Sequence, residues 1–450
     1  ALYDDSVLAT EPEHGPSVFM PGAGDAVFRS DWSAQATYML LRGENGVARA
    51  QGFSHEHADE TSFVLYAGGE MLAVDAGYIN FANHDKVNEG RNHNVVLVDG
   101  QGPPRFTALG QTIGGGNDAF IRDSFTSAVG DYAEVDASYQ GVDFKRRVFF
   151  ADRSYFLIAD EITSDEEHDY EWRLHGNGGG DSGGTYAREG NLARWTRAGA
   201  ELVAYLPEAP GLVAVDSDTI HSFDFLEEQT HTVLRMQQRG ANARYLAVLY
   251  PRGTGAEEPV FITLPTEGGE GALVALVEAQ DLAWVRVADA EGTTVFGPDT
   301  TLTSDAHFGY ARYVDGTLTR FSVQDATELS AGGTVFSASD TVDVSVELDA
   351  GRFAGFVRGP GTGYQVSLPL AGRTLDDASF TGELLGTSVE GDLLTLNLAG
   401  EGELELRFSQ PPVVQLHVVG RTGWRTGLSP FRTRVGRPMR FEVLSFTAED

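Results

Sequence analysis

The sequence predicts an all-β protein built from antiparallel sheets packed as a sandwich. Apolar residues recur with a period of two rather than 3.6, in short runs separated by Gly, Asp or Asn. Glycine accounts for 54 of the 450 residues, above the usual share of about 7%, which favours strands and turns. No run of ten or more residues has a convincing amphipathic helical pattern, and strands that follow one another without helices between them indicate antiparallel pairing.

The predicted strands follow in order as apolar runs between turn residues. The first two, residues 63–66 and 71–74, flank the pair Gly68-Gly69, which is typical of a two-residue hairpin turn. In that register Asp75 would lie opposite Ser62. The later strands show the same short apolar pattern at residues 94–98, 147–150, 155–158, 245–250 and 341–347.

Two boundaries divide the chain into three predicted parts. Strands shorten and Gly-rich turns become frequent after about residue 310, which predicts a large domain over residues 1–310 and a smaller β domain over residues 311–410. Pro411-Pro412 then opens an Arg-rich tail, residues 411–450, with six arginines and three acidic residues. This tail is either a last strand pair with solvated arginines or a segment that docks on an acidic surface of its own body or of a neighbouring copy.

Composition excludes several classes of function. The net charge of −34 argues against non-specific binding to nucleic acid or to an anionic membrane. The absence of cysteine removes disulfides, thiolate metal sites and cysteine nucleophiles, so any metal must use His and carboxylate ligands. No apolar stretch approaches the ~18 residues of a membrane span. We expect an extracellular or periplasmic protein.

Histidines cluster in one part of the sequence, since four of the eleven lie between residues 55 and 93. His55, His57 and Asp59 are spaced by two and would share one side of an extended chain, which suits a cation or an anionic sugar. His84 lies in a predicted exposed loop and is a candidate substrate contact. Arg91 and Arg105 flank the cluster and could bind a substrate carboxylate or pair with local acids.

A metal site can be assembled from His57, Asp75 and His93. Two imidazoles and a carboxylate suit Zn²⁺ and leave room for a further ligand, although another divalent cation remains open. His57 and Asp75 can meet only if the chain bends or bulges between residues 58 and 61, because a straight strand would point His57 away from Asp75. The alternative is that Asp75 accepts turn hydrogen bonds and His93 binds backbone.

These segments resemble the β domain of heparinase II/III-like polysaccharide lyases. The resemblance is strongest over residues 15–180 and rests on the motifs His55-Glu-His57-Ala-Asp59, Asp75-Ala-Gly-Tyr78 and His93-Asn94-Val-Val. It implies a large two-layered antiparallel β-sandwich followed by a smaller β-sandwich-like domain. It also implies cleavage of uronate-containing polysaccharides by β-elimination, with an acidic polysaccharide as substrate.

The resemblance also implies roles for individual residues. His55 would be the catalytic histidine, and His57, Asp75 and His93 would hold a structural zinc beside it. Tyr78 would line the cleft. In this family further active-site groups lie on an N-terminal helical toroid, and no part of this sequence has its pattern. We therefore expect a helical toroid polypeptide as partner, with the chain being a processed half, a fragment, or a sandwich that has lost activity.

Two other functions fit the sequence. The first is a non-catalytic structural or glycan-binding protein that forms homo-oligomers or fibres through residues 411–450. The second is metal-dependent hydrolysis at the His-Asp site.

Overall fold

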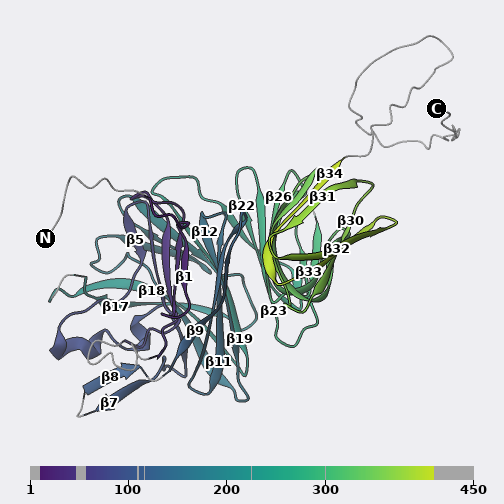
Figure 1. Ribbon diagram of the computed structural model, residues 1–450. Helices are drawn as coiled ribbons and strands as arrows, with labels where there is room; N and C mark the ends of the chain where they lie inside the picture. The colour runs from purple at the N-terminus through teal and green to yellow at the C-terminus, as the bar shows by residue number, and fades with distance from the viewer. Residues whose placement is uncertain are drawn as a thin grey trace, which may run out of the picture. The chain divides into compact units, whose positions relative to one another are not determined.

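The strands of the protein form a stack of antiparallel sheets (Figure 1). The computed structural model describes residues 11–46, 57–108, 111–115, 117–223, 226–298 and 300–409. Within these residues there are 34 strands and two short 3-10 helices, which confirms the predicted all-β fold.

The first layer of the sandwich consists of two sheets. A five-stranded sheet has the order β1 (Val18–Met20), β2 (Asp25–Arg29), β3 (Tyr38–Arg42), β4 (Phe63–Ala67) and β5 (Glu70–Ala73). A four-stranded sheet has the order β17 (Val213–His221), β18 (Gln229–Gly240), β13 (His168–His175) and β6 (Val96–Val98). A bridge between Ala73 and Gly176 joins them, so the two sheets act as one layer.

The second layer is an eight-stranded sheet. Its order is β14 (Thr185–Glu189), β15 (Leu192–Thr196), β16 (Ala200–Tyr205), β19 (Ala243–Gly253), β12 (Tyr155–Thr163), β11 (Val142–Ala151), β10 (Gly130–Tyr139) and β9 (Ala119–Thr126). One apolar core contains residues of all three sheets, including Phe28, Trp172 and Phe150. The predicted two-layered sandwich is therefore present.

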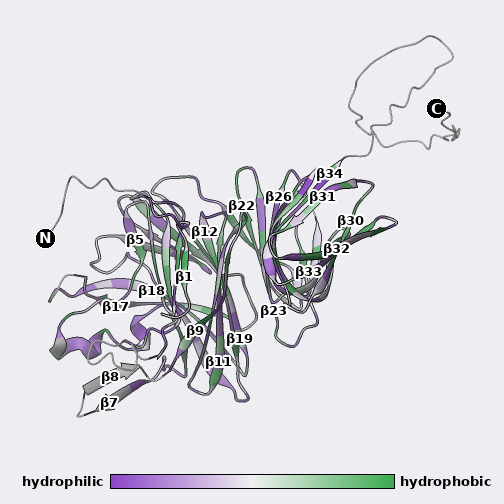
Figure 2. Ribbon diagram, viewed as in Figure 1, coloured by the Kyte–Doolittle hydropathy of each residue, from purple (hydrophilic) through white to green (hydrophobic). Residues whose placement is uncertain are grey.

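Short elements connect β5 to the eight-stranded sheet. They are η1 (Phe81–Lys86), η2 (Gly90–Asn92) and a separate hairpin of β7 (Arg105–Ala108) and β8 (Gln111–Gly115). Among these elements η1 is mainly hydrophilic, whereas apolar residues follow the stacked strands (Figure 2).

The last sheet, which we call the C-terminal sheet, has 15 strands among the described residues. They are β20 (Val260–Leu264), β21 (Thr266–Glu267), β22 (Gly269–Ala275), β23 (Gln280–Arg286), β24 (Thr293–Phe296), β25 (Thr301–Ser304), β26 (Phe308–Val314), β27 (Thr317–Ala331), β28 (Thr334–Leu348), β29 (Arg352–Arg358), β30 (Tyr364–Pro369), β31 (Thr374–Phe380), β32 (Glu383–Glu390), β33 (Leu393–Ala399) and β34 (Glu401–Ser409). The sheet encloses a core of its own.

The eight-stranded sheet is covered on both faces. Val148 and Phe150 of β11 belong to the sandwich core, whereas Phe149 packs with Phe308 and Tyr310 of the C-terminal sheet. A strand buried on both sides has no polar face, which explains the unbroken apolar run from Val148 to Ala151.

The predicted domain limit at residue 310 can be compared with the order of strands in the sheets. Residue 310 lies inside β26, and the strands from β20 onward already belong to the C-terminal sheet. We therefore propose the division between β19 and β20. Residues 411–450 lie outside the described residues. Among those described, no helix has the length and apolar character needed to cross a membrane.

Candidate functional site

The candidate site lies where the five-stranded and four-stranded sheets meet. The backbone N–H of Val74, just after β5, donates to the carbonyl of His175 at 2.8 Å. Beyond this point the chain turns at Asp75 and Gly77. Gly77 has a φ of 69°, and a Cβ there would lie 2.0 Å from the carbonyl oxygen of Ser222, so only glycine fits.

The three predicted metal ligands come together at this turn. Ligand atoms of His57, Asp75 and His93 all lie within 4.8 Å of one another. Oδ2 of Asp75 is 2.7 Å from Nδ1 of His93, and the imidazole rings of His57 and His93 are 5.1 Å apart. The other oxygen of Asp75 accepts the N–H of Gly77 at 3.0 Å. Asp75 thus both stabilises the turn and faces the histidines.

The pKa shifts of His57 and Asp75 leave both side chains in the protonation state that binds a metal ion. Burial and the neighbouring His93 lower the pKa of His57 to about 3, so its imidazole is neutral. Burial acts to raise the pKa of Asp75, but His93 outweighs it and the pKa lies below its usual range. For His93 burial acts to lower the pKa, and Asp75 reverses this into a net rise. A metal ion bound by His93 would release its proton.

The donor set fits a zinc ion. Two imidazole nitrogens and one carboxylate oxygen are typical zinc ligands and leave a position for a further ligand. Nδ1 of His93 is the nitrogen that faces Asp75, so an ion shared by the two residues would lie at this nitrogen.

The hairpin before the site departs from its predicted register. Gly68 and Gly69 form the turn, and Ala67 pairs with Glu70 and Tyr66 with Met71 as predicted. The register then shifts, and Leu65 pairs with Ala73, so β5 ends before Asp75 and Asp75 does not pair with Ser62. The predicted bend before β4 is present, since Thr61 has a φ of 74° and Ser62 N–H donates to Asp59 O.

A buried arginine of the eight-stranded sheet stabilises this bend through hydrogen bonds. Arg146 of β11 is paired with Asp160 of β12 at 2.6 Å, and both side chains are fully buried. Its Nη1 donates to the carbonyls of Thr61 at 2.6 Å and Asn94 at 2.7 Å. The segments that carry His57 and His93 are therefore held by one guanidinium group.

A pocket of about 440 Å³ opens beside the metal ligands. His57 and Asp75 line it together with Arg42, Asp59 and Tyr78. The Arg42 guanidinium is 2.6 Å from a Glu44 oxygen and 3.5 Å from Asp59. Arg42 was not predicted from the sequence, because no local motif marks it as a pocket residue.

Comparison with known proteins agrees with this fold. Residues 13–242, slightly more than half of the chain, match the C-terminal domain of heparinase II/III-like proteins. The chain belongs to the heparinase II/III-like family.

Two curated proteins are similar to this chain in sequence. A heparin-sulfate lyase of Bacteroides stercoris is 29% identical over 175 residues, which are 36% of this chain and 24% of that protein. A heparin-sulfate lyase of Pedobacter heparinus is 26% identical over 153 residues, which are 32% of this chain and 21% of that protein. The matched segment is thus a quarter or less of the length of these relatives.

Solved structures of heparinase II/III-like proteins share the fold. A mutant heparan sulfate lyase from Pedobacter heparinus has a TM-score of 0.52 at 19% identity, over 64% of this chain and 45% of that one. A heparinase III structure has a TM-score of 0.50 at 16% identity, over 68% of this chain and 43% of that one.

The other predicted site residues of this heparinase II/III-like chain divide between two pockets. Tyr78 lines the pocket beside the metal ligands, and its ring is 5.3 Å from that of His84. His84 is buried rather than exposed, and its ring is 4.9 Å from that of His57. The expectation of an exposed loop at His84 was wrong, because η1 folds back over His57. His55 lies outside the described residues.

Arg91 and Arg105 lie at a different pocket. Both line another pocket, of about 440 Å³, whose lining includes neither His57 nor Asp75. Nε of Arg91 is 2.8 Å from Glu89, and Arg105 donates to the carbonyl of Asn88 at 2.8 Å. The structure therefore gives both arginines local partners.

Proposed function

We propose that this chain forms the β-sandwich side of the active site of a secreted polysaccharide lyase that acts on uronate-containing glycans by β-elimination. The observation that carries the proposal is the cluster of His57, Asp75 and His93 beside an open pocket, in a chain of this family. A lyase that depolymerises polysaccharides works outside the cytoplasm, in the extracellular or periplasmic space.

The reaction needs three groups around one uronate. A base removes the proton at C5, a positive group neutralises the carboxylate as charge develops, and an acid protonates the oxygen that leaves C4. The C4–O bond breaks as the C4–C5 double bond forms. Arg42 lines the pocket as a cation suited to the carboxylate, and Tyr78 lines it as a hydroxyl able to transfer a proton. We assign the base to His55, and the opposite wall to a helical toroid.

The metal ion has a structural role in this proposal. Bound to His57, Asp75 and His93, it would cross-link three chain segments and neutralise Asp75. The side chains of this site position the pocket wall, and the metal takes no part in bond breaking.

Activity is the first test. We would incubate the full chain, and the complex in which it is purified, with a panel of polyuronates and follow the ultraviolet absorbance of the unsaturated product. We expect His55→Ala to lower the rate about 100-fold or more. The matched control is His14→Ala, since His14 is exposed and lies outside the pocket. No product from any polyuronate with either preparation would exclude the lyase.

Metal content is the second test and does not depend on activity. We expect His57→Ala to lose most of the zinc measured by elemental mass spectrometry, and to unfold at a lower temperature. His14→Ala should keep its zinc. An unchanged metal content in His57→Ala would contradict the metal assignment.

A further inference from the structure

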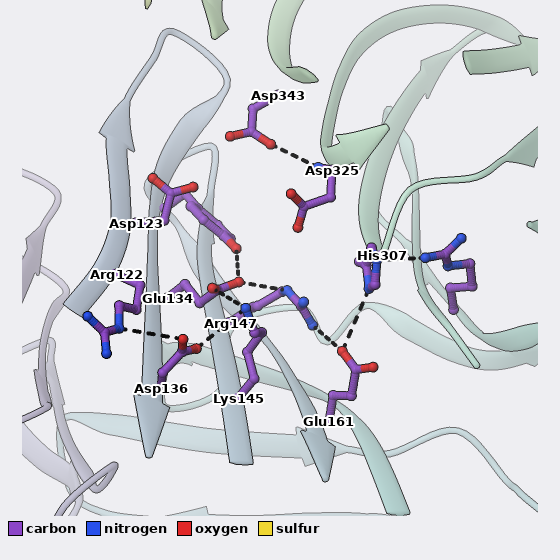
Figure 3. A network of polar contacts seen from close by, with 12 residues as sticks. Arg122, Asp123, Glu134, Asp136, Lys145, Arg147, Glu161, His307, Asp325 and Asp343 are labelled. Atoms are coloured by element: carbon purple, nitrogen blue, oxygen red, sulfur yellow. Dashed lines mark hydrogen bonds and ion pairs between the residues drawn. The ribbon is translucent and has the colours of Figure 1, made fainter. Parts of the chain in front are cut away.

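A second polar cavity lies between the sandwich and the C-terminal sheet. It has a volume of about 550 Å³ and is lined from β10, β11 and β12 on one side and by residues of the C-terminal sheet on the other. Figure 3 shows the polar contacts at this place, which run from Asp136 through Lys145, Glu134, Arg147 and Glu161 to His307. A cavity of this size is within the usual range for small-ligand sites, about 300 to 1,000 Å³.

The side chains of two consecutive arginines of β11 lie on opposite faces of the eight-stranded sheet. Arg146 points to the metal-ligand segments, and Arg147 points to this second cavity. The Arg147 side chain is only 1% exposed and lies 3.0 Å from Glu134 and 3.0 Å from Glu161. Lys145 extends the row, with Nζ 2.6 Å from Glu134.

The network crosses to the C-terminal sheet through His307. Nη2 of Arg286 is 2.6 Å from Nε2 of His307, and Nδ1 of His307 is 3.7 Å from Glu161. Because a guanidinium can only donate, Nε2 must be the acceptor and the proton must lie on Nδ1, facing Glu161. The contact with Arg286 thus fixes the tautomer of His307 in this network (Figure 3).

Stability alone does not explain such a network. Buried ion pairs gain little net free energy over apolar residues of the same size, because both charges lose their hydration. What the network provides is a wall whose donors and acceptors are held in fixed positions. Asp325 adds an acceptor at the rim, on a left-handed backbone with a φ of 54°.

The charge of the lining selects among ligands. Five carboxylates, those of Asp136, Asp143, Glu161, Asp305 and Asp325, face the three basic side chains of Lys145, Arg147 and Arg286. This excess of negative charge repels a polyuronate. Among the described residues, the ligand atoms that lie within 4.8 Å of one another are those of His57, Asp75 and His93, which are not in this cavity.

A neutral sugar carries many hydroxyl donors and acceptors and no charge, so it suits a lining of this kind. We propose that this cavity binds uncharged sugar residues of a glycan chain. The site is separate from the pocket of the proposed lyase reaction, and the proposal holds whether or not the chain is a lyase.

The test uses two rim substitutions with matched controls. Asp325→Asn and Arg286→Gln each remove one charge from the cavity lining and conserve side-chain shape or reach. The control for the first is Asp315→Asn, because Asp315 has the same left-handed backbone, with a φ of 49°, and does not line the cavity. The control for the second is Arg239→Gln, at an exposed arginine paired with Asp169.

Binding of neutral cello-, malto-, xylo- and galacto-oligosaccharides to the full chain would be measured by titration calorimetry and ligand-observed NMR. We expect at least one series to bind, and each rim substitution to weaken that binding about tenfold while both controls leave it unchanged. The proposal is overturned if no neutral series binds at millimolar concentration. It is also overturned if the rim variants bind as the native chain does, or if only polyuronates compete for the site.

Discussion

The side chain of Asn94 joins four segments around the metal ligands. Its Nδ2 donates to the carbonyls of Phe63 at 2.7 Å and Val74 at 3.1 Å, and its Oδ1 accepts the N–H of His175 at 2.7 Å. Its own N–H donates to the Ser62 hydroxyl at 3.1 Å. One fully buried amide therefore satisfies backbone groups of both sheets in the first layer.

Replacing Asn94 should be costly. Asn94→Ala leaves three buried backbone groups without partners, and each costs about 1 to 3 kcal/mol, so we expect the free energy of unfolding to fall by about 3 kcal/mol or more in urea titrations. The control is Asn397→Ala, which removes a single exposed contact with Gln365 and should cost less than about 1 kcal/mol. Equal losses for the two variants would contradict this role.

The pair of Arg146 and Asp160 allows a sharper experiment. Arg146→Met leaves the Asp160 carboxylate buried and uncompensated, which should cost about 3 to 5 kcal/mol in the free energy of unfolding. Adding Asp160→Leu removes that stranded charge, so the double variant should be more stable than Arg146→Met alone. Equal stability of the two variants would show that the lost bonds to Thr61 and Asn94, which both variants lack, outweigh the stranded charge.

Candidate ligands that stand in short sequence motifs could be predicted from the sequence. The distant residues that hold them in place through hydrogen bonds could not. His57, Asp75 and His93 stand in recognisable short motifs, and the structure brings them together. Arg146 acts on carbonyls 85 and 52 residues away in sequence, which no local pattern specifies. The sequence nevertheless contained a sign of buried ion pairs between these strands, since Arg146-Arg147 interrupts one apolar strand and Asp160-Glu161 interrupts the next.

Among the elements, the hairpin of β4 and β5 has a turn that the sequence predicts and a register shift that it does not. The Gly68-Gly69 turn is a local property, and it was predicted correctly. The register shift after Met71 is set by packing, because Leu72 and Ala73 are both buried in the sandwich core. An alternating pattern cannot produce two consecutive buried residues without a bulge, but only the assembled core shows where the bulge is needed.

An ion pair between β19 and β22 should make stability depend on pH. Oε1 of Glu270 is 3.0 Å from Nε of Arg244, yet burial dominates over Arg244 and raises the pKa of Glu270 to about 7. A carboxyl whose pKa is raised on folding binds its proton more tightly in the folded state. The free energy of unfolding therefore falls as the pH rises from about 4.5 to 7, by up to about 1.4 kcal/mol per pH unit.

This dependence can be isolated with one substitution. Glu270→Gln cannot titrate, so its stability relative to the native chain should be lowest near pH 5 and should improve steadily up to pH 7.5. Denaturant titrations at several pH values give this difference directly. Glu267→Gln, at an exposed residue of neighbouring β21, should follow the native pH profile. A constant difference between Glu270→Gln and the native chain across this range would contradict the raised pKa.

For the whole molecule, the fold class was predictable from the sequence, whereas the sheet that each strand joins was not. Period-two patterns and Gly-rich turns determine that strands form and pair antiparallel. They do not determine which sheet a strand joins, because strands of the sandwich and of the C-terminal sheet have the same short apolar pattern. Phe149, Phe308 and Tyr310 meet across the two sheets in one core, so apolarity marks no boundary between them.

The charge distribution of the whole chain gives the last prediction. Residues 411–450 carry six arginines against three acidic residues, whereas the net charge of the chain is −34. Opposite charges on one chain favour head-to-tail contacts between copies, and such contacts form fibres when their rotation does not close. Residues 1–410 are a compact unit by themselves, so the tail can be removed without cutting the sheets.

We expect the full chain to associate with rising concentration in sedimentation velocity at low salt, and to dissociate at about 0.5 M salt, where the screening length is only a few ångströms. The truncated chain, residues 1–410, should stay monomeric in both conditions. Replacing the six arginines by lysine keeps the charge and should preserve association, whereas replacement by glutamine should abolish it. If the truncated chain associates as the full chain does, the tail has no part in assembly.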